Sequence, residues 1–140
     1  MKRATITIFA FLAVANAYGC ESPKDLLTKL HKGSFSPYLR GDASLKDLGY
    51  VRRAQDSICV YGLTLVMPNQ HGATRLLVVG PDGALRATYL LTLGEFIGLK
   101  GAAALVRDRR GRVESIDLGE TGVPANVFFD GEVSELFLPK

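Results

Sequence analysis

The spacing of hydrophobic positions changes along the chain, from a helical period near the N-terminus to strand-like alternation further on. Residues 22–25, Ser-Pro-Lys-Asp, combine a capping serine, a proline at the first helical position and an acid three residues after the cap, which is typical of a helix start. Leu26, Leu27 and Leu30 follow on one stripe, and Gly33 stands where such a helix would end. The pattern predicts one helix over this segment.

A second helix start is indicated at residues 44–47. Leu45, Leu48 and Val51 follow at helical spacing, although Gly49 interrupts the run. The residues between the two predicted helices, 33–42, are expected to form a loop.

Strand patterns dominate after residue 57. Residues 58–67 are β-branched and aromatic and are apolar on both faces, which favours a central strand. Three pairs of strand-like runs follow, and each pair flanks a turn that contains Asp and Gly. The paired runs are 74–79 with 84–93, 102–107 with 113–118, and 127–129 with 132–138.

These elements together predict an α+β, β-rich fold. One or two N-terminal helices would pack on an antiparallel meander sheet, or on a small barrel, of about seven strands. A hydrophobic content of 47% and the lack of low-complexity tracts indicate a folded chain. We expect a single β-rich domain over residues 18–140.

The first 17 residues are expected to act as an export signal. Lys2 and Arg3 precede an apolar run over residues 4–14, which is too short to anchor the chain across a bilayer. Residues 15–17, Ala-Asn-Ala, fit a signal peptidase site, so the mature chain should start near Tyr18. The predicted location is the periplasm or the extracellular space.

Removal of this signal also changes the charge of the protein. The formal net charge falls from +3 to +1 when Lys2 and Arg3 leave, so the sequence does not indicate nucleic-acid binding. Residues 18–112 hold 14 basic and 8 acidic side chains, whereas residues 113–140 hold one basic and six acidic ones. Such an uneven charge distribution can steer a charged partner, or the acidic and basic parts can pair with each other within the molecule.

Two cysteines, Cys20 and Cys59, leave two exclusive interpretations. In an oxidising compartment an isolated pair should close into a disulfide, which is the interpretation we favour. In the other, Cys20 is the lipidated first residue of a lipoprotein and the protein associates with a membrane. Tyr18 is too bulky for the usual lipobox, and Cys59 would then remain a free thiol.

The sequence lacks a catalytic constellation. Its two histidines, His31 and His71, have no neighbouring ligands at zinc-site spacing. No phosphate-binding glycine loop precedes a helix, and no Gly-x-Ser-x-Gly motif occurs. We therefore expect a non-enzymatic protein without a metal or a cofactor.

An arginine-rich turn is predicted between residues 107 and 112. Guanidinium groups suit carboxylates, phosphates and anionic glycan or lipid surfaces. Alternatively, the charges keep a solvated turn soluble and protect a strand edge from pairing. The candidate anion-binding residues are Arg107, Arg109, Arg110 and Arg112.

Residues 94–101 place three apolar side chains between glycines, together with one acid and one base. An exposed segment of this kind would form a compact apolar plug with polar edges, as in an interface hot spot. Alternatively, it is a bulged strand whose apolar side chains complete the core. The candidate contact residues are Glu95, Phe96, Ile97, Leu99 and Lys100.

Two further segments carry weaker signals for binding. The loop at residues 68–72 offers Asn69, Gln70 and His71 to a partner, or merely turns the chain. The acidic terminal hairpin, with Asp130, Glu132 and Glu135, could meet a basic partner or pair with the basic N-terminal half of the chain.

These patterns lead to one leading hypothesis and one alternative. The first is a periplasmic protein-binding module, an inhibitor or immunity protein that occludes a secreted or cell-wall-degrading enzyme and is monomeric when free. The alternative is an envelope-associated structural protein or lipoprotein whose basic hairpin contacts anionic lipid or glycan. Both rest on architecture and compartment, because no motif names a reaction.

Overall fold

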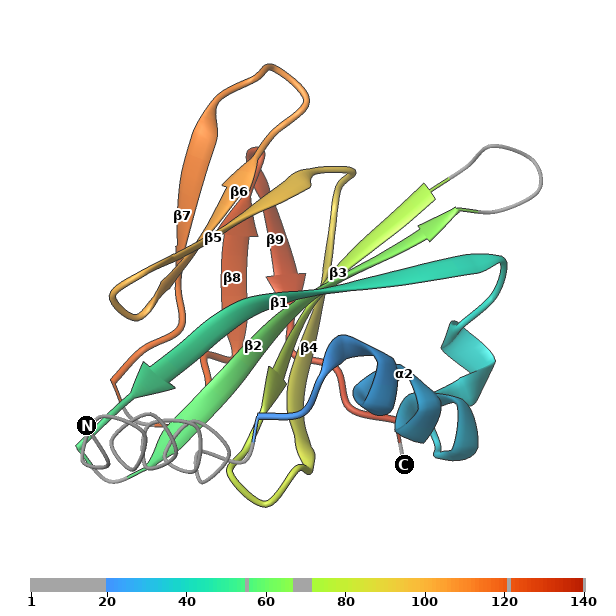
Figure 1. Cartoon of the computed structure of the whole chain (residues 1–140). Helices are drawn as coiled ribbons and strands as arrows, with labels where there is room; N and C mark the ends of the chain where they lie inside the picture. The colour runs from blue at the N-terminus through green and yellow to red at the C-terminus, as the bar shows by residue number, and fades with distance from the viewer. Residues whose placement is uncertain (1–19, 55, 67–71, 121, 140) are drawn as a thin grey trace, which may run out of the picture.

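The computed structural model describes residues 20–54, 56–66, 72–120 and 122–139, and in these ranges nine strands accompany a single α-helix (Figure 1). The helical elements are α2 (Pro23–Lys32) and the 3-10 turn η1 (Ser36–Tyr38). The strands are β1 (Asp42–Arg52), β2 (Ser57–Val66), β3 (Gly72–Val79), β4 (Leu85–Leu91), β5 (Glu95–Lys100), β6 (Ala103–Arg107), β7 (Val113–Asp117), β8 (Asn126–Phe129) and β9 (Glu132–Glu135).

The strands form three antiparallel sheets in chain order. β1–β2–β3–β4 make a four-stranded sheet, β5–β6–β7 a three-stranded sheet and β8–β9 a two-stranded one. The expected α+β, β-rich meander is confirmed, and the sheets stay open, without a closed barrel. The C-terminal segment adds a short continuation to the first sheet, where Phe137 and Thr88 exchange backbone hydrogen bonds.

The four-stranded sheet is buried on both faces, which divides the molecule into layers. One face carries α2 and η1, and the other packs against strands β5–β8 (Figure 1). β2 lies between β1 and β3 and is buried on both faces, as its apolar run predicts. The inner core between the sheets includes Val60, Leu76, Tyr89, Phe96, Val106, Ile116 and Phe129. The outer core under the helix includes Leu26, Leu30, Phe35, Tyr61, Leu63 and Leu77.

Helix α2 forms where its cap and stripe predict it. The Ser22 hydroxyl accepts a hydrogen bond from the backbone N–H of Asp25 at 3.2 Å, and Pro23 occupies the first turn. Leu26 and Leu30 are buried against the sheet. Capping supplies only part of the helix stability, because a ten-residue helix depends mainly on this apolar contact.

The second predicted helix is wrong, because residues 42–52 form strand β1. A β-bulge between Asp47 and Gly49 shifts the register of β1 against β2. In a regular strand Leu48 and Val51 would lie on opposite faces, but the extra residue at the bulge places both in the inner core. Leu45 lies on the helix-covered face. The bulge produced the three-residue spacing that imitates a helix. Gly49 adopts a φ of +133°, a conformation that favours glycine.

The three predicted hairpins are confirmed, with bounds that differ by a few residues. The tightest joins β8 to β9 through Asp130 and Gly131, which both have positive φ, at 52° and 75°. A two-residue Asp-Gly loop of this kind matches the twist of the paired strands. This turn fixes the register that places Phe128 directly opposite Val133.

A disulfide joins Cys20 to Cys59, with a Cα–Cα distance of 5.7 Å. This bond confirms the favoured interpretation and contradicts the lipoprotein alternative, which requires the Cys20 sulfur for a lipid. Disulfides persist in oxidising environments, so the bond indicates a compartment of that kind. The predicted signal, residues 1–17, lies outside the described residues. Within those residues, no helix has the length and apolar character needed to cross a membrane.

Candidate binding surfaces

The arginine-rich turn between β6 and β7 is organised around a buried carboxylate. The Asp108 side chain accepts hydrogen bonds from the backbone N–H groups of Arg110, at 2.8 Å, and Arg112, at 3.0 Å. Arg112 also donates its Nε to Asp108 at 3.3 Å. The structure thus gathers the four candidate arginines on one exposed turn, as expected: Arg107, Arg109, Arg110 and Arg112.

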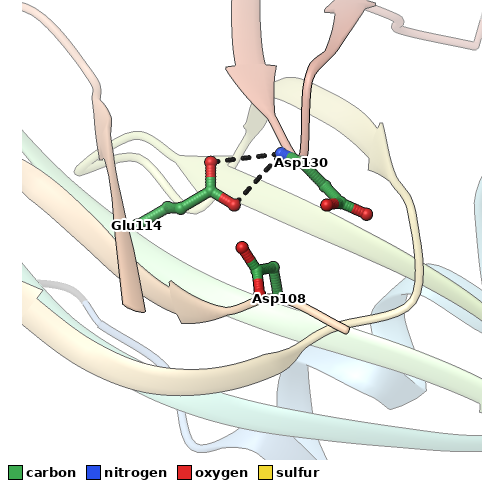
Figure 2. A group of neighbouring side chains, drawn as sticks. All are labelled: Asp108, Glu114 and Asp130. Atoms are coloured by element: carbon green, nitrogen blue, oxygen red, sulfur yellow. Dashed lines mark hydrogen bonds between the residues drawn. The ribbon is translucent and has the colours of Figure 1, made fainter. Parts of the chain in front are cut away.

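Three acidic side chains from two turns and one strand meet beside this turn (Figure 2). Asp108, Glu114 and Asp130 each place a carboxylate oxygen within 4.8 Å of the others. Both oxygens of Glu114 accept the backbone N–H of Asp130, at 3.1 and 3.2 Å. Arg109 pairs with Asp130 at 3.0 Å, and Arg112 pairs with Asp108 at 3.3 Å.

This acid cluster connects the β6–β7 hairpin to the β8–β9 turn. Its three carboxyl groups are the described residues that could ligate a cation. Asp108 and Asp130 are already paired with arginines, and all three acids take part in hydrogen bonds. These contacts are sufficient to explain the cluster as a structural link between the two hairpins. Arg109 and Arg112 therefore serve internal charge balance, which leaves Arg107 and Arg110 without an ion pair among the described residues.

The two central acids of the cluster have opposite pKa shifts. Burial raises the pKa of Glu114, and its hydrogen bond to Asp108 raises it further. Burial also opposes ionisation of Asp108, but hydrogen bonds from Arg112, Glu114 and Arg110 outweigh it and lower the pKa of Asp108 to about 2. Glu114 therefore keeps its proton to higher pH than an isolated glutamate, beside the ionised Asp108.

Glu114→Gln is expected to retain or raise stability at neutral pH, because an amide can donate to Asp108 without a titratable proton. The raised pKa of Glu114 means that its contribution is complete below the unfolded value near 4.5 and is lost as pH rises through the folded pKa. Thermal unfolding from about pH 4 to 8 should show wild type losing stability relative to Glu114→Gln. The exposed Glu120→Gln serves as the control, and parallel curves for wild type and Glu114→Gln would contradict the assignment.

Within the segment 94–101, residues 95–100 form strand β5 instead of an exposed loop. Phe96 is 4% exposed and lies in the inner core, and Leu99 is half-buried against it. Ile97 projects outward at a bulge and is 37% exposed. The plug expectation is therefore wrong for Phe96, and the bulged-strand alternative is confirmed for it. Glu95 and Lys100 are exposed at the ends of the strand.

The remaining candidate contacts, Asn69, Gln70 and His71, lie outside the described residues.

An exposed apolar strip runs from β4 onto the β8–β9 hairpin and consists of Leu90, Phe128 and Val133. Phe128 is 70% exposed, Val133 is 55% exposed and Leu90 is 49% exposed. Phe128 and Val133 are cross-strand partners, and Val133 and Leu90 line one groove of about 410 Å³ between β4 and β9. The side chains on the opposite side of β8, Val127 and Phe129, are buried in the inner core.

Sequence reasoning missed this strip because residues 127–129 are apolar throughout, so the pattern does not show which face is buried. The Asp-Gly turn could have revealed it, since a two-residue loop after Phe129 sets Phe128 against Val133. Comparison of the chain with models of protein families, with curated proteins and with solved structures finds no match.

Proposed function

We propose that this protein is an exported protein-binding module and that its apolar strip is the contact surface. The observation that carries the proposal is the exposure of Phe128 and Val133 as a pair in the middle of an ordered hairpin. A contiguous apolar patch with a polar border is typical of a protein interface, in which large aromatic side chains supply much of the binding free energy. Leu90 extends this patch across the β4–β9 groove.

The hairpin that presents the strip is held firmly. Val127 and Phe129 anchor β8 in the inner core, and the acid cluster fixes the turn through Asp130. The Ser134 hydroxyl donates a hydrogen bond to the backbone carbonyl of Leu90, which ties β9 to β4. A pre-ordered surface lowers the entropy that binding must overcome.

The border of the strip is acidic. Glu132 and Glu135 line the same groove as Val133 and Leu90, and Glu135 pairs across the strands with Asn126. These charges favour a partner that surrounds an apolar centre with basic side chains, and they would accelerate its association at low ionic strength. The acidic C-terminal segment of the sequence is thus gathered beside the proposed contact surface.

Within this class, we propose an inhibitor or immunity protein that occludes an exported enzyme. The disulfide supports the compartment, and a rigid exposed hairpin suits insertion beside a partner's cleft. Because Phe96 is buried, we assign the contact with the partner to the β8–β9 hairpin instead of to residues 94–101.

The proposal is tested by photocrosslinking from position 128 in the exporting cell, followed by purification of the captured protein. Val133→Ala should weaken the purified complex by about 30-fold, as for a hot-spot side chain. Val66→Ala is the matched control, since Val66 is 53% exposed on β2 and lies outside the strip. Both variants should retain the wild-type melting temperature.

Four outcomes of this experiment separate binding, inhibition and the choice of contact surface. Stoichiometric loss of the partner's catalytic activity supports inhibition, and binding without such loss contradicts the inhibitor role alone. Equal weakening by Val133→Ala and Val66→Ala contradicts the strip as the contact surface. Crosslinking only to a second copy of the chain would instead make the strip a homodimer interface.

A further inference from the structure

Arg75 occupies an unusual position on β3, on the sheet face that carries α2 and η1. Its guanidinium carbon lies 5.8 Å from the ring centroid of Phe35, 5.7 Å from that of Tyr38 and 5.5 Å from that of Phe137. Phe35 directly precedes η1, Tyr38 belongs to η1, and Phe137 lies in the C-terminal segment. The three rings surround the guanidinium, and cation–π attraction holds the Arg75 side chain in place.

The Arg75 guanidinium has no carboxylate partner in the described part of the chain. Among the described residues, four other arginines form ion pairs with acids, but no Asp or Glu pairs with Arg75. Its hydrogen-bond partner is the Thr88 hydroxyl, at a long 3.5 Å. Burial lowers the pKa of Arg75, because the charged guanidinium loses part of its solvation. Five N–H donors with one weak acceptor leave capacity for an anion.

A hollow of about 450 Å³ lies beside this guanidinium, next to η1. Arg40 also lines the hollow, is exposed, and forms no ion pair with a described acid. The rest of the lining is mostly apolar: Pro37, Tyr38, Leu65, Ala73 and Leu90. The hollow therefore combines two guanidinium groups with an apolar wall.

We propose that this hollow binds a carboxylate attached to an apolar chain, with the carboxylate between Arg75 and Arg40. Arginine forks match the two oxygens of a carboxylate, and the bond is strengthened by the partly desolvated setting of Arg75. Pro37 and Leu90, which are exposed, would contact the apolar part of the ligand. Either a free aliphatic acid or the C-terminus of a peptide with an apolar last residue supplies this chemistry.

Binding of two matched pairs of probes tests the proposal by titration calorimetry. Octanoate is compared with 1-octanol, and acetyl-Gly-Gly-Leu with a free carboxylate is compared with its C-terminal amide. We expect the carboxylate of at least one pair to bind more than about tenfold tighter than its neutral match. The pair that shows this preference identifies the source of the ligand. Equal affinity within both pairs would overturn the proposal.

Variants of the two arginines complete the test. Arg40→Gln should weaken carboxylate binding by about tenfold without a change in melting temperature, because Arg40 is exposed. Arg75→Lys keeps the charge and loses the fork, so it should also weaken binding. Arg110→Gln, on the distant β6–β7 turn, is the control, and an equal effect of Arg110→Gln and Arg40→Gln would show general charge attraction and overturn the site. These probes do not involve Phe128 or Val133, so failure here leaves the protein-binding proposal standing.

Discussion

Phe96→Ala is expected to lower the free energy of unfolding by about 3–5 kcal/mol, which corresponds to a melting temperature lower by roughly 10–20 °C. Phe96 lies in the inner core, between β5 and the four-stranded sheet. Removing its ring leaves a cavity lined by side chains that cannot collapse into it completely. Ile97→Ala, at the exposed neighbouring position, should change stability by less than about 0.5 kcal/mol.

The close contact between Phe96 and Gly62 of β2 sharpens this prediction. A Cβ added at Gly62 would lie 2.2 Å from Cδ2 of the Phe96 ring, so Gly62→Ala alone should destabilise the protein by about 1–3 kcal/mol. In the Phe96→Ala background the ring is gone and the same change should cost much less. A coupling of at least about 1 kcal/mol in the double-mutant cycle is therefore expected.

Chemical denaturation of the four proteins in this cycle measures both quantities. Additive effects of the two substitutions would contradict the contact between Phe96 and Gly62. An unchanged melting temperature for Phe96→Ala would mean that the side chain is exposed, and would restore residues 94–101 as a candidate contact segment.

Reduction of the Cys20–Cys59 disulfide is expected to cost about 4 kcal/mol of stability, the second large effect. The bond closes a loop with a sequence separation of 39 residues, and the estimate follows from the loop-closure entropy that the bond removes from the unfolded chain. The bond also holds the residues before α2 to β2, where Glu21 accepts a hydrogen bond from the Tyr61 hydroxyl at 2.7 Å.

Thermal unfolding with and without reductant measures this contribution, because reduction leaves both sulfur atoms in place. The variant Cys20→Ala, Cys59→Ala should match the reduced protein, apart from the packing lost at the buried Cys59. Intact mass of the protein from its native host provides an independent check. A mature start at Tyr18 and the loss of two hydrogen atoms are expected, and an acyl group on Cys20 would contradict the disulfide.

The sequence by itself determined the elements whose signals are local. Ser22 and Pro23 mark the start of α2, the two-sided apolar run marks β2 as central, and Asp130–Gly131 marks the last turn. Each of these features depends on residues within a few positions of one another, so periodicity and turn chemistry are sufficient to find them.

Only the tertiary structure decided the features that depend on contacts between distant segments. The bulge at Asp47 and Gly49 needs β2 as its partner, and without that partner the same spacing predicts a helix. Which face of residues 127–129 is buried depends on the inner core, and this choice exposes Phe128.

The candidate sites depend on distant contacts in the same way. The acid cluster brings together Asp108 from the β6–β7 turn, Glu114 from β7 and Asp130 from the β8–β9 turn. Arg75 lies between rings that precede and follow it by more than thirty residues in the chain. The fold also decides which described acids lie within reach of its guanidinium, and none of them pairs with it. Burial and charge pairing are properties of the assembled layers, which is why local sequence patterns could predict the strands but not the surfaces that we propose for binding.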